Sequence, residues 1–203
     1  MAKQKLTKRQ IQANKTRSKI YKIAVDLMEK KGFNNITIEE ISKKAKVSVG
    51  AFYHYYNSKE DILFEIFRRA DEYFENEVAQ VLREGDLNSL DQIVVFFKFY
   101  AKYNVERGLE NVSQLYNTKN KFFIARERYM ITLLDEIVSE GQKKGEIIRD
   151  MAPESITDYL FTAGRGVIID WCIHEAGYDL EEAMEKYMSR LVTVFSANFQ
   201  RIQ

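Results

Sequence analysis

The chain has 203 residues, of which 45% are hydrophobic and 30% charged, with nine glycines, one proline and a net charge of +1. This composition is typical of long helices and excludes a disordered or β-rich chain, and no apolar run is long enough to indicate a transmembrane helix. The single cysteine excludes an intrachain disulfide, and the basic N-terminus lacks the apolar stretch of a secretory signal, so we expect a cytoplasmic protein.

Charge is distributed unevenly along the chain. Residues 1–60 hold 14 basic and 5 acidic side chains, a balance of +9, whereas the remainder has a balance of −8. A charge run of this kind either keeps a surface soluble or attracts a polyanion. Beside the helix-turn-helix pattern described below, the second interpretation is favoured, and it indicates DNA.

The first 19 residues are basic and contain no acidic side chain. Such an arm can follow the phosphates of DNA or enter a minor groove. Equally, it can be a disordered leader that adds only non-specific attraction. Its basic residues are Lys3, Lys5, Lys8, Arg9, Lys15, Arg17 and Lys19.

The next segment predicts a helix that runs to about Lys31. Apolar residues recur there at helical spacing and form one stripe for packing. Gly32 supplies a left-handed C-terminal cap, and Phe33 can pack back against the helix. The stripe consists of Ile20, Ile23, Ala24, Leu27 and Met28.

Residues 36–59 read as two short helices joined by a tight turn. Thr37 is a candidate N-cap, and Glu40 three residues later completes a capping box. Lys46 and Val47 form the turn, and Ser48 caps the second helix. Two helices at this spacing make a helix-turn-helix pattern, whose second helix is expected in the major groove of DNA.

The second helix of this motif should be buried on one side only. Phe52 and Tyr56 lie four residues apart and should face the core. Val49, Gly50 and Tyr53 then fall on exposed faces, and His54 is as readily a solvated surface residue as a contact.

The rest of the chain stays helical and predicts an all-α fold. A helix from Lys59 to about Arg83 leaves the DNA-binding module without a linker. We expect further helices over residues 90–103, 109–116, 121–144, 153–174 and 180–201. The expected domains are 1–60, a helix-turn-helix DNA-binding domain with a basic arm, and 61–203, a helical ligand-binding and dimerisation domain.

Residues 16–63 resemble the DNA-binding domain of the TetR family of bacterial transcription regulators. The chain departs from the family pattern at Tyr55, where histidine is usual, at Asn57, where proline is usual, and at Lys46, where a small residue is common. These departures concern contact geometry rather than the fold. The matching residues are Gly32-Phe33, Thr37, Ile41, Val47-Ser48, Gly50, Phe52-Tyr53, Tyr56, Ser58-Lys59-Glu60 and Leu63.

Helix N-termini with free N–H groups can hold DNA phosphates, and Thr37, Ser48 and Lys59 are placed for such contacts. Val49 and Ala51 can meet only thymine methyl groups, so we expect few base hydrogen bonds and some specificity from DNA shape. The candidate DNA-binding residues are Thr37, Lys46, Ser48, Val49, Gly50, Ala51, Tyr53, His54, Tyr55 and Lys59.

The resemblance also implies a homodimer through the last two helices. Ala163, Gly164 and Gly166 permit close approach of a second helix, although the two glycines can instead relieve crowding inside one chain. The family further implies a small, largely apolar or aromatic effector in the second domain, whose binding moves the long connecting helix.

Candidate effector-binding residues are aromatic with a few polar neighbours, although for any single aromatic a place in the ordinary core is the favoured interpretation. Cys172 reads as a small buried apolar residue rather than a redox switch. The candidates are Phe96, Tyr100, Tyr103, Tyr116, Asn117, Phe123, Arg126, Arg165 and Trp171.

The sequence therefore predicts a dimeric repressor that binds a palindromic operator and is released by a small molecule. The alternative is a DNA-bound regulator that interacts with another protein and binds no small molecule. Two histidines, one cysteine and no recognisable nucleophile, metal or phosphate-loop spacing argue against an enzyme. We expect no catalytic residue, no metal, no cofactor and no membrane partner.

Overall fold

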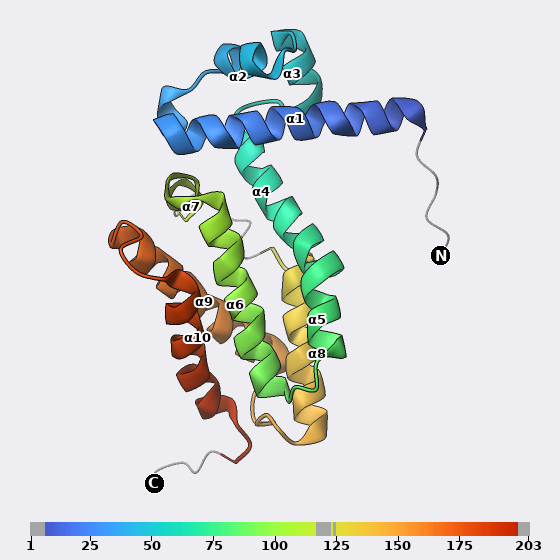
Figure 1. The fold of residues 1–203 in the computed structure, drawn as a ribbon. Coiled ribbons are helices and arrows are strands. Elements are labelled where there is room, and N and C mark those ends of the chain that lie inside the picture. The colour runs from blue at the N-terminus through green and yellow to red at the C-terminus, as the bar shows by residue number, and fades with distance from the viewer. Residues whose placement is uncertain (1–6, 117–122, 124, 199–203) are drawn as a thin grey trace. The chain divides into compact units, whose positions relative to one another are not determined.

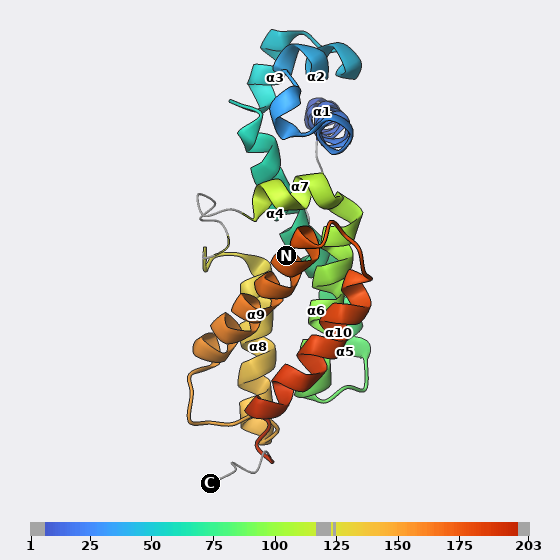
Figure 2. The same ribbon diagram turned by 90° about the vertical axis from the view of Figure 1, so that its left-hand side faces the viewer.

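The structure is a computed structural model that describes residues 7–116, 123 and 125–198. The chain forms two compact units that divide after Ile66. Within the described residues the fold is all-α, because the one β-type pairing there is an isolated antiparallel bridge between Ile147 and Ser196. Figures 1 and 2 show the helices in two views at right angles.

The first unit packs α2 (Ile38–Ala45) and α3 (Val49–Tyr55) against the long α1 (Lys8–Lys31) (Figure 1). A short 3-10 turn, Phe33–Asn35, leads from α1 to α2, and the unit ends within α4 (Glu60–Tyr73). The predicted stripe of α1 is mostly buried, as expected. The core residues include Ile20, Ala24, Leu27, Met28, Ile41, Ala45 and Phe52, each fully buried.

The expectation of a basic arm up to Lys19 is wrong for its second part, because α1 already begins at Lys8. The physical reason is a capping box: the Thr7 hydroxyl accepts a bond from the backbone N–H of Gln10, whose side chain binds the Thr7 N–H in return. Residues 8–19 are therefore helical, and the predicted contacts of Lys3 and Lys5 lie outside the described residues.

The second unit begins in α4, which continues through a π-helical segment, Phe74–Val78, into α5 (Ala79–Glu84). It then adds α6 (Ser89–Arg107), α7 (Leu109–Leu115) and α8 (Tyr129–Lys144), followed by α9 (Pro153–Ile173) and α10 (Leu180–Leu191). In both views α6 runs beside α10, and α8 runs beside α9 (Figures 1 and 2). One continuous apolar core joins these helices.

Two predicted helices of this unit are shorter than expected. The helix expected from Lys121 begins at Tyr129, because Arg128 is its N-cap with an extended ψ of 131° and Asp71 of α4 accepts the Met130 N–H in the first turn. The first two residues of the expected helix, 121 and 122, lie outside the described residues. The last helix leaves α-geometry after Leu191 and is followed by a 3-10 turn, Val192–Phe195, whose β-branched residues have a lowered α-helix propensity. That turn is fixed by a backbone bond from the Ile148 N–H to the carbonyl of its last residue. The end of the expected helix, residues 199–201, lies outside the described residues.

Among the described residues, no helix is both long and apolar enough to cross a membrane.

Candidate functional site

The helix-turn-helix is set by local backbone contacts. The Thr37 hydroxyl accepts the Glu40 N–H at 3.2 Å, and the Ser48 hydroxyl accepts the Ala51 N–H at 3.0 Å. Both predicted N-caps are therefore present. The full capping box is not, because the Glu40 carboxylate binds Lys31 instead. Lys46 makes the turn with a left-handed φ of 54°.

One face of α3 is exposed and the other is buried, as predicted. Phe52 and Tyr56 are 0% and 2% exposed, whereas Tyr53 is 52% exposed. At Gly50 the nearest atom to an added Cβ is 3.9 Å away, so a surface can approach the backbone there. Val49 and His54 are exposed beside it. This face presents a flat backbone patch and a phenol to solvent.

Three of the other DNA-binding candidates are only partly exposed. Lys59 donates from Nζ to the carbonyl oxygens of Phe33 and Ile36 at 2.8 and 3.2 Å, so it also ties the loop after α1 to the start of α4. Ala51 and Tyr55 are half-buried on α3. Their contacts with DNA remain predictions, as do those of Thr37, Lys46 and Ser48.

The surface of the first unit carries many cations without a carboxylate partner. Arg17 is not one of them, because it pairs at 2.8 Å with the buried Glu65 and so fastens α1 to α4. Cations that find no acidic partner keep their full attraction for phosphates. Among the described residues of this unit, the cations outside any ion pair are Lys8, Arg9, Lys15, Lys19, Lys22, Lys43, Lys44, Lys46 and Lys59, of which Lys59 instead donates to two backbone carbonyls.

In the second unit, several effector candidates meet in one group of rings. The Tyr100 and Tyr116 hydroxyl oxygens lie 2.7 Å apart and share a hydrogen bond. The Tyr116 and Phe123 rings are 4.6 Å apart, and Phe161 lies edge-on to Tyr100. We call Phe96, Phe97, Tyr100, Tyr116, Phe123 and Phe161 the aromatic cluster. It brings together residues of α6 and α9 with Tyr116, which directly follows α7, and with the segment before α8.

Polar side chains lie at the end of α6 and in α7 that sequence reasoning missed. Asn104 is buried and donates to the Tyr100 carbonyl at 2.8 Å, and the buried Asn111 donates to the Arg107 carbonyl at 2.8 Å. Tyr103, a predicted site residue, stacks on Tyr73. The burial of Asn104 could have been predicted from the sequence, because this residue falls at helical spacing on the apolar stripe of α6.

A second unpredicted feature is an ion pair that joins α4 to the start of α8. Arg128 is 8% exposed, and its Nε and Nη2 lie 3.1 and 3.3 Å from the two carboxylate oxygens of Asp71. Asp71 also accepts the Met130 N–H, so it caps α8 from another helix. The guanidinium lies over Phe67, whose ring meets Phe123 of the aromatic cluster at 5.0 Å.

The remaining effector candidates are engaged elsewhere. Arg126 pairs with Asp158 at 2.5 Å and lies 3.6 Å from Asp135, so it points to α9 and α8. Trp171 is buried and donates its indole N–H to the Tyr178 carbonyl. Phe96 is fully buried among rings, the environment of a core residue. Asn117 lies outside the described residues.

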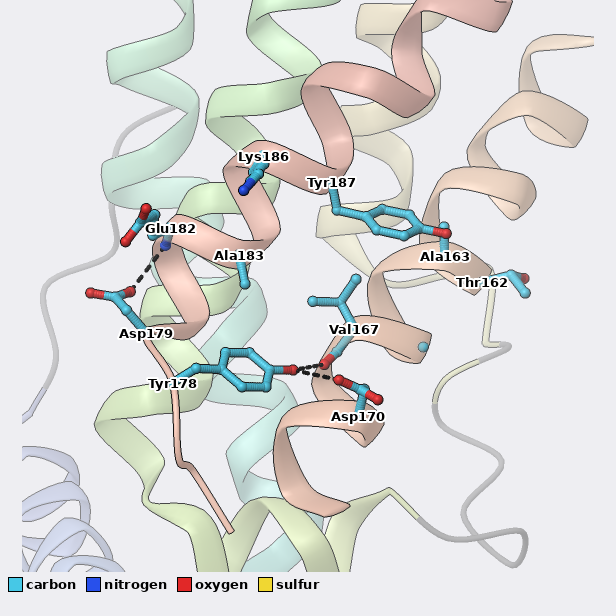
Figure 3. Close-up of a pocket in the computed structure, with 11 residues that line it drawn as sticks. Thr162, Ala163, Val167, Asp170, Tyr178, Asp179, Glu182, Ala183, Lys186 and Tyr187 are labelled. Atoms are coloured by element: carbon cyan, nitrogen blue, oxygen red, sulfur yellow. Dashed lines mark hydrogen bonds between the residues drawn. The ribbon is translucent and has the colours of Figure 1, made fainter. Parts of the chain in front are cut away.

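A groove of about 780 Å³ runs between α9 and α10 (Figure 3). Tyr178 spans its floor and donates to Asp170 at 2.9 Å. Tyr187 lies across from Ala163 at the other end (Figure 3). None of the predicted effector residues lines this groove. Its lining consists of Thr162, Ala163, Gly166, Val167, Asp170, Tyr178, Asp179, Glu182, Ala183, Lys186 and Tyr187.

The two glycines of α9 have different environments. A Cβ on Gly164 would lie 2.7 Å from the Phe97 ring, so this glycine relieves crowding inside the chain. A Cβ on Gly166 would meet nothing within 4 Å, and Gly166 lines the groove. Of the two alternatives left open by the sequence, internal packing holds for Gly164, and only Gly166 is free to face another molecule.

The described residues contain no group of three or more metal-ligating side chains that could hold an ion. Cys172 is half-buried, and burial raises the pKa of its thiol to about 11. A thiol that stays protonated is a poor nucleophile and a poor redox sensor.

Comparison with known proteins agrees with this geometry. Residues 20–66 match the family model described as bacterial regulatory proteins of the tetR family, and residues 125–194 match the C-terminal region of YsiA-like proteins. The repressor NicS of Pseudomonas putida is 30% identical over 146 residues, which cover 68% of each chain.

Two further relatives span more of the chain. The fatty acid metabolism regulator protein of Bacillus subtilis is 22% identical over 175 residues, or 84% of this chain and 90% of that protein. The crystal structure of Thermus thermophilus FadR in complex with lauroyl-CoA is 25% identical, with a TM-score of 0.68, and covers 87% of this chain and 93% of that one.

Proposed function

Because the chain belongs to the TetR family of bacterial transcription regulators, we propose that it represses as a homodimer on a palindromic operator and is released by an acyl-CoA. Membership of the family makes the chain a DNA-binding transcriptional repressor and not an enzyme. The dimer, the palindrome and the effector are the proposal. The observation that supports it most is the exposed face of α3 among unpaired cations.

That face supports a particular way of reading DNA. Gly50 and Val49 bring backbone and a methyl surface to the groove floor, and Tyr53 offers a hydroxyl to a phosphate or sugar. The N-terminus of α2, capped by Thr37, can accept a second phosphate. One such module reads few base pairs, and a two-fold symmetric pair on a palindrome doubles the readout.

The groove between α9 and α10 supports the second copy as its occupant. Large apolar side chains are exposed on α9, on α10 and on the 3-10 turn that follows α10. The small residues Ala163 and Gly166 line the groove itself. A monomer rarely leaves such a surface open to water. The exposed side chains are Tyr159, Ile169, Ile173, Tyr187 and Val194.

The effector assignment comes from the relatives and from the chemistry of the aromatic cluster. Thermus thermophilus FadR was solved with lauroyl-CoA, and an acyl chain needs a long apolar lining. The aromatic cluster offers rings from α6, α9 and the segment before α8, with the Tyr100–Tyr116 hydroxyl pair as a polar group among them.

Release needs a mechanical link from the effector to α4. The contacts run from Tyr116 through Phe123 and Phe67 to Arg128, which holds Asp71 of α4. An acyl-CoA that displaces Phe123 would disturb this ion pair and so shift α4, which continues into the DNA-binding unit. The factor by which the effector lowers DNA affinity then equals the ratio of its affinities for the free protein and for the DNA-bound protein.

Footprinting on genomic DNA with the purified protein tests the proposal. We expect protected palindromes, which lauroyl-CoA abolishes and coenzyme A does not. Sedimentation at micromolar concentration should show a dimer, and Tyr187→Glu should give a monomer. Monomeric wild-type protein, or footprints that persist at saturating lauroyl-CoA, would contradict the dimer and the effector respectively.

A regulator without a small-molecule effector is the second candidate. The observation that favours it is the close packing of Phe96, Phe97 and Phe161, whose ring centres lie 5.3 to 5.9 Å apart. This part of the aromatic cluster is filled by its own side chains. Persistence of the footprints in the presence of lauroyl-CoA would favour this candidate.

A further inference from the structure

The Tyr100–Tyr116 pair contains a hydrogen-bond donor that the described residues do not use. Two phenol hydroxyls carry two protons, and the single bond between their oxygens, 2.7 Å long, uses one of them. No other hydrogen bond joins either hydroxyl to a described residue. The pair therefore has one O–H left to donate within a largely buried site.

A buried donor without an acceptor is costly, by about 1–3 kcal/mol for a neutral group, unless a ligand satisfies it. Tyr100 is 5% exposed, and Tyr116 is half-buried. Burial raises the pKa of both phenols, so both remain protonated and able to donate over the physiological range.

The charges near the pair favour an acceptor with negative character. The guanidinium groups of Arg128 and Arg165 act on both phenols and partly oppose the effect of burial on their pKa. Arg128 is neutralised by Asp71, whereas Arg165 has one hydrogen bond within the described part of the chain, to the neutral Thr162 hydroxyl at 3.0 Å. Arg165 thus leaves a positive field at the hydroxyl pair.

The described side chains that meet the rings of the pair are aromatic. Phe97 and Phe161 present ring edges to Tyr100 at 6.0 and 5.9 Å, and Phe123 lies 4.6 Å from the Tyr116 ring. The site therefore combines a donor, a positive field and aromatic walls. This combination matches a carbonyl oxygen carried on an apolar chain.

We infer that the free hydroxyl of the Tyr100–Tyr116 pair recognises the effector by donating a hydrogen bond to its acyl carbonyl oxygen. This inference rests on the proposed acyl effector and adds the atoms that select it. A thioester and a free carboxylic acid share this chemistry. A site built to satisfy a polar group discriminates strongly against an analogue that lacks the group, because its own donor is then left unpaired.

The test compares lauroyl-CoA with S-dodecyl-CoA, a thioether with the same chain and head group but no carbonyl. Calorimetric titration of the full-length protein should show lauroyl-CoA binding about tenfold more tightly. In the Tyr100→Phe/Tyr116→Phe double variant the two affinities should agree within about twofold. A single variant that loses the preference identifies the hydroxyl that donates to the carbonyl, whereas a single variant in which the other tyrosine takes over the contact keeps the preference.

Tyr178→Phe serves as the matched control. It also removes a bonded phenol hydroxyl from the second unit, but one that donates to Asp170 beside the groove. It should leave the tenfold discrimination unchanged. Denaturant midpoints for all variants separate folding from recognition, because loss of a purely structural bond between α6 and Tyr116 would lower stability without changing the ratio of the two affinities.

The outcomes separate the inference from the proposed function. Equal affinity of the wild-type protein for the two CoA compounds overturns the inference alone and leaves acyl-CoA as the effector. Binding of neither compound, with no binding of laurate, overturns both. Binding of laurate alone, lost in the double variant, supports the carbonyl contact and identifies the free acid as its source.

Discussion

Alanine at Gly164 should destabilise the protein, although alanine favours helices. The added Cβ would lie 2.7 and 2.9 Å from two Phe97 ring carbons and 3.3 Å from the Met188 methyl carbon. Carbon atoms at rest are about 3.5–4.0 Å apart, so the overlap approaches 1 Å. Phe97 cannot move aside, because it is fully buried against Phe96, Tyr100 and Phe161.

The expected magnitude follows from two opposing terms. Replacing glycine by alanine within a helix gains about 0.8–1 kcal/mol. Overpacking a closed core costs about 1–3 kcal/mol. For Gly164→Ala the second term is the larger, and the free energy of unfolding should fall by about 1 kcal/mol, within a range of about 0–2 kcal/mol. For Gly166→Ala only the first term applies within one chain, because no atom of the chain lies within 4 Å of the added atom.

Urea denaturation at a fixed protein concentration measures both changes, since the protomer concentration affects the stability of a dimer. The midpoint should fall for Gly164→Ala and stay level or rise for Gly166→Ala. A fall of equal size in both variants would refute the assignment of Gly164 to internal packing and Gly166 to the outer face.

Three further changes test other parts of the site. Tyr53→Ala should weaken operator binding about tenfold in a gel-shift titration, because Tyr53 is 52% exposed on α3, and should leave the melting temperature nearly unchanged; a large drop would place this residue in the core. Asp71→Asn should reduce at least fivefold the effect of lauroyl-CoA on DNA affinity, because it removes the partner of Arg128 on α4. Asp158→Asn, which removes a partner of Arg126, should change that effect less than twofold. Similar losses in both variants would reject α4 as the path by which the effector acts on DNA binding. Cys172 should react with a disulfide reagent at pH 7 about 100-fold more slowly than an ordinary thiol, because a pKa of about 11 lowers its thiolate fraction; loss of DNA binding on oxidation, absent in Cys172→Ser, would contradict this.

The helix-turn-helix was predictable because its signals are local. Thr37 and Ser48 cap helices two or three residues away, and the spacing of Phe52 and Tyr56 reports the buried face directly. Each of these contacts joins residues fewer than five positions apart. The resemblance to a known family added to this reading without changing it.

The effector region was less predictable because its contacts are distant in sequence. Arg128 and Asp71 are 57 residues apart, and their pairing decides where α8 begins. The aromatic residues were identifiable by type, but composition could not show that Phe96 packs in the core while Tyr100 meets Tyr116. Periodicity likewise could not assign Gly164 to the inside of the chain.

The early start of α1 was missed for a different reason. Thr7 and Gln10 form a capping box, the same local signal that was recognised at Thr37. The lysines near this capping box have ordinary helix propensity, but their positive charge favoured the interpretation of residues 1–19 as an extended basic arm. The Thr7–Gln10 capping box marks the start of α1 more directly than the positive charge of the segment does.

The most direct test of the whole account is the affinity of the purified protein for a fluorescent palindromic duplex, measured over a range of salt concentrations with and without lauroyl-CoA. We expect the logarithm of the binding constant to fall linearly with the logarithm of salt, by about 0.9 per neutralised phosphate, and to fall at least tenfold further when lauroyl-CoA is added. No retention of any selected duplex at low salt would contradict DNA binding through α3. Retention that lauroyl-CoA leaves unchanged would contradict release by an acyl effector.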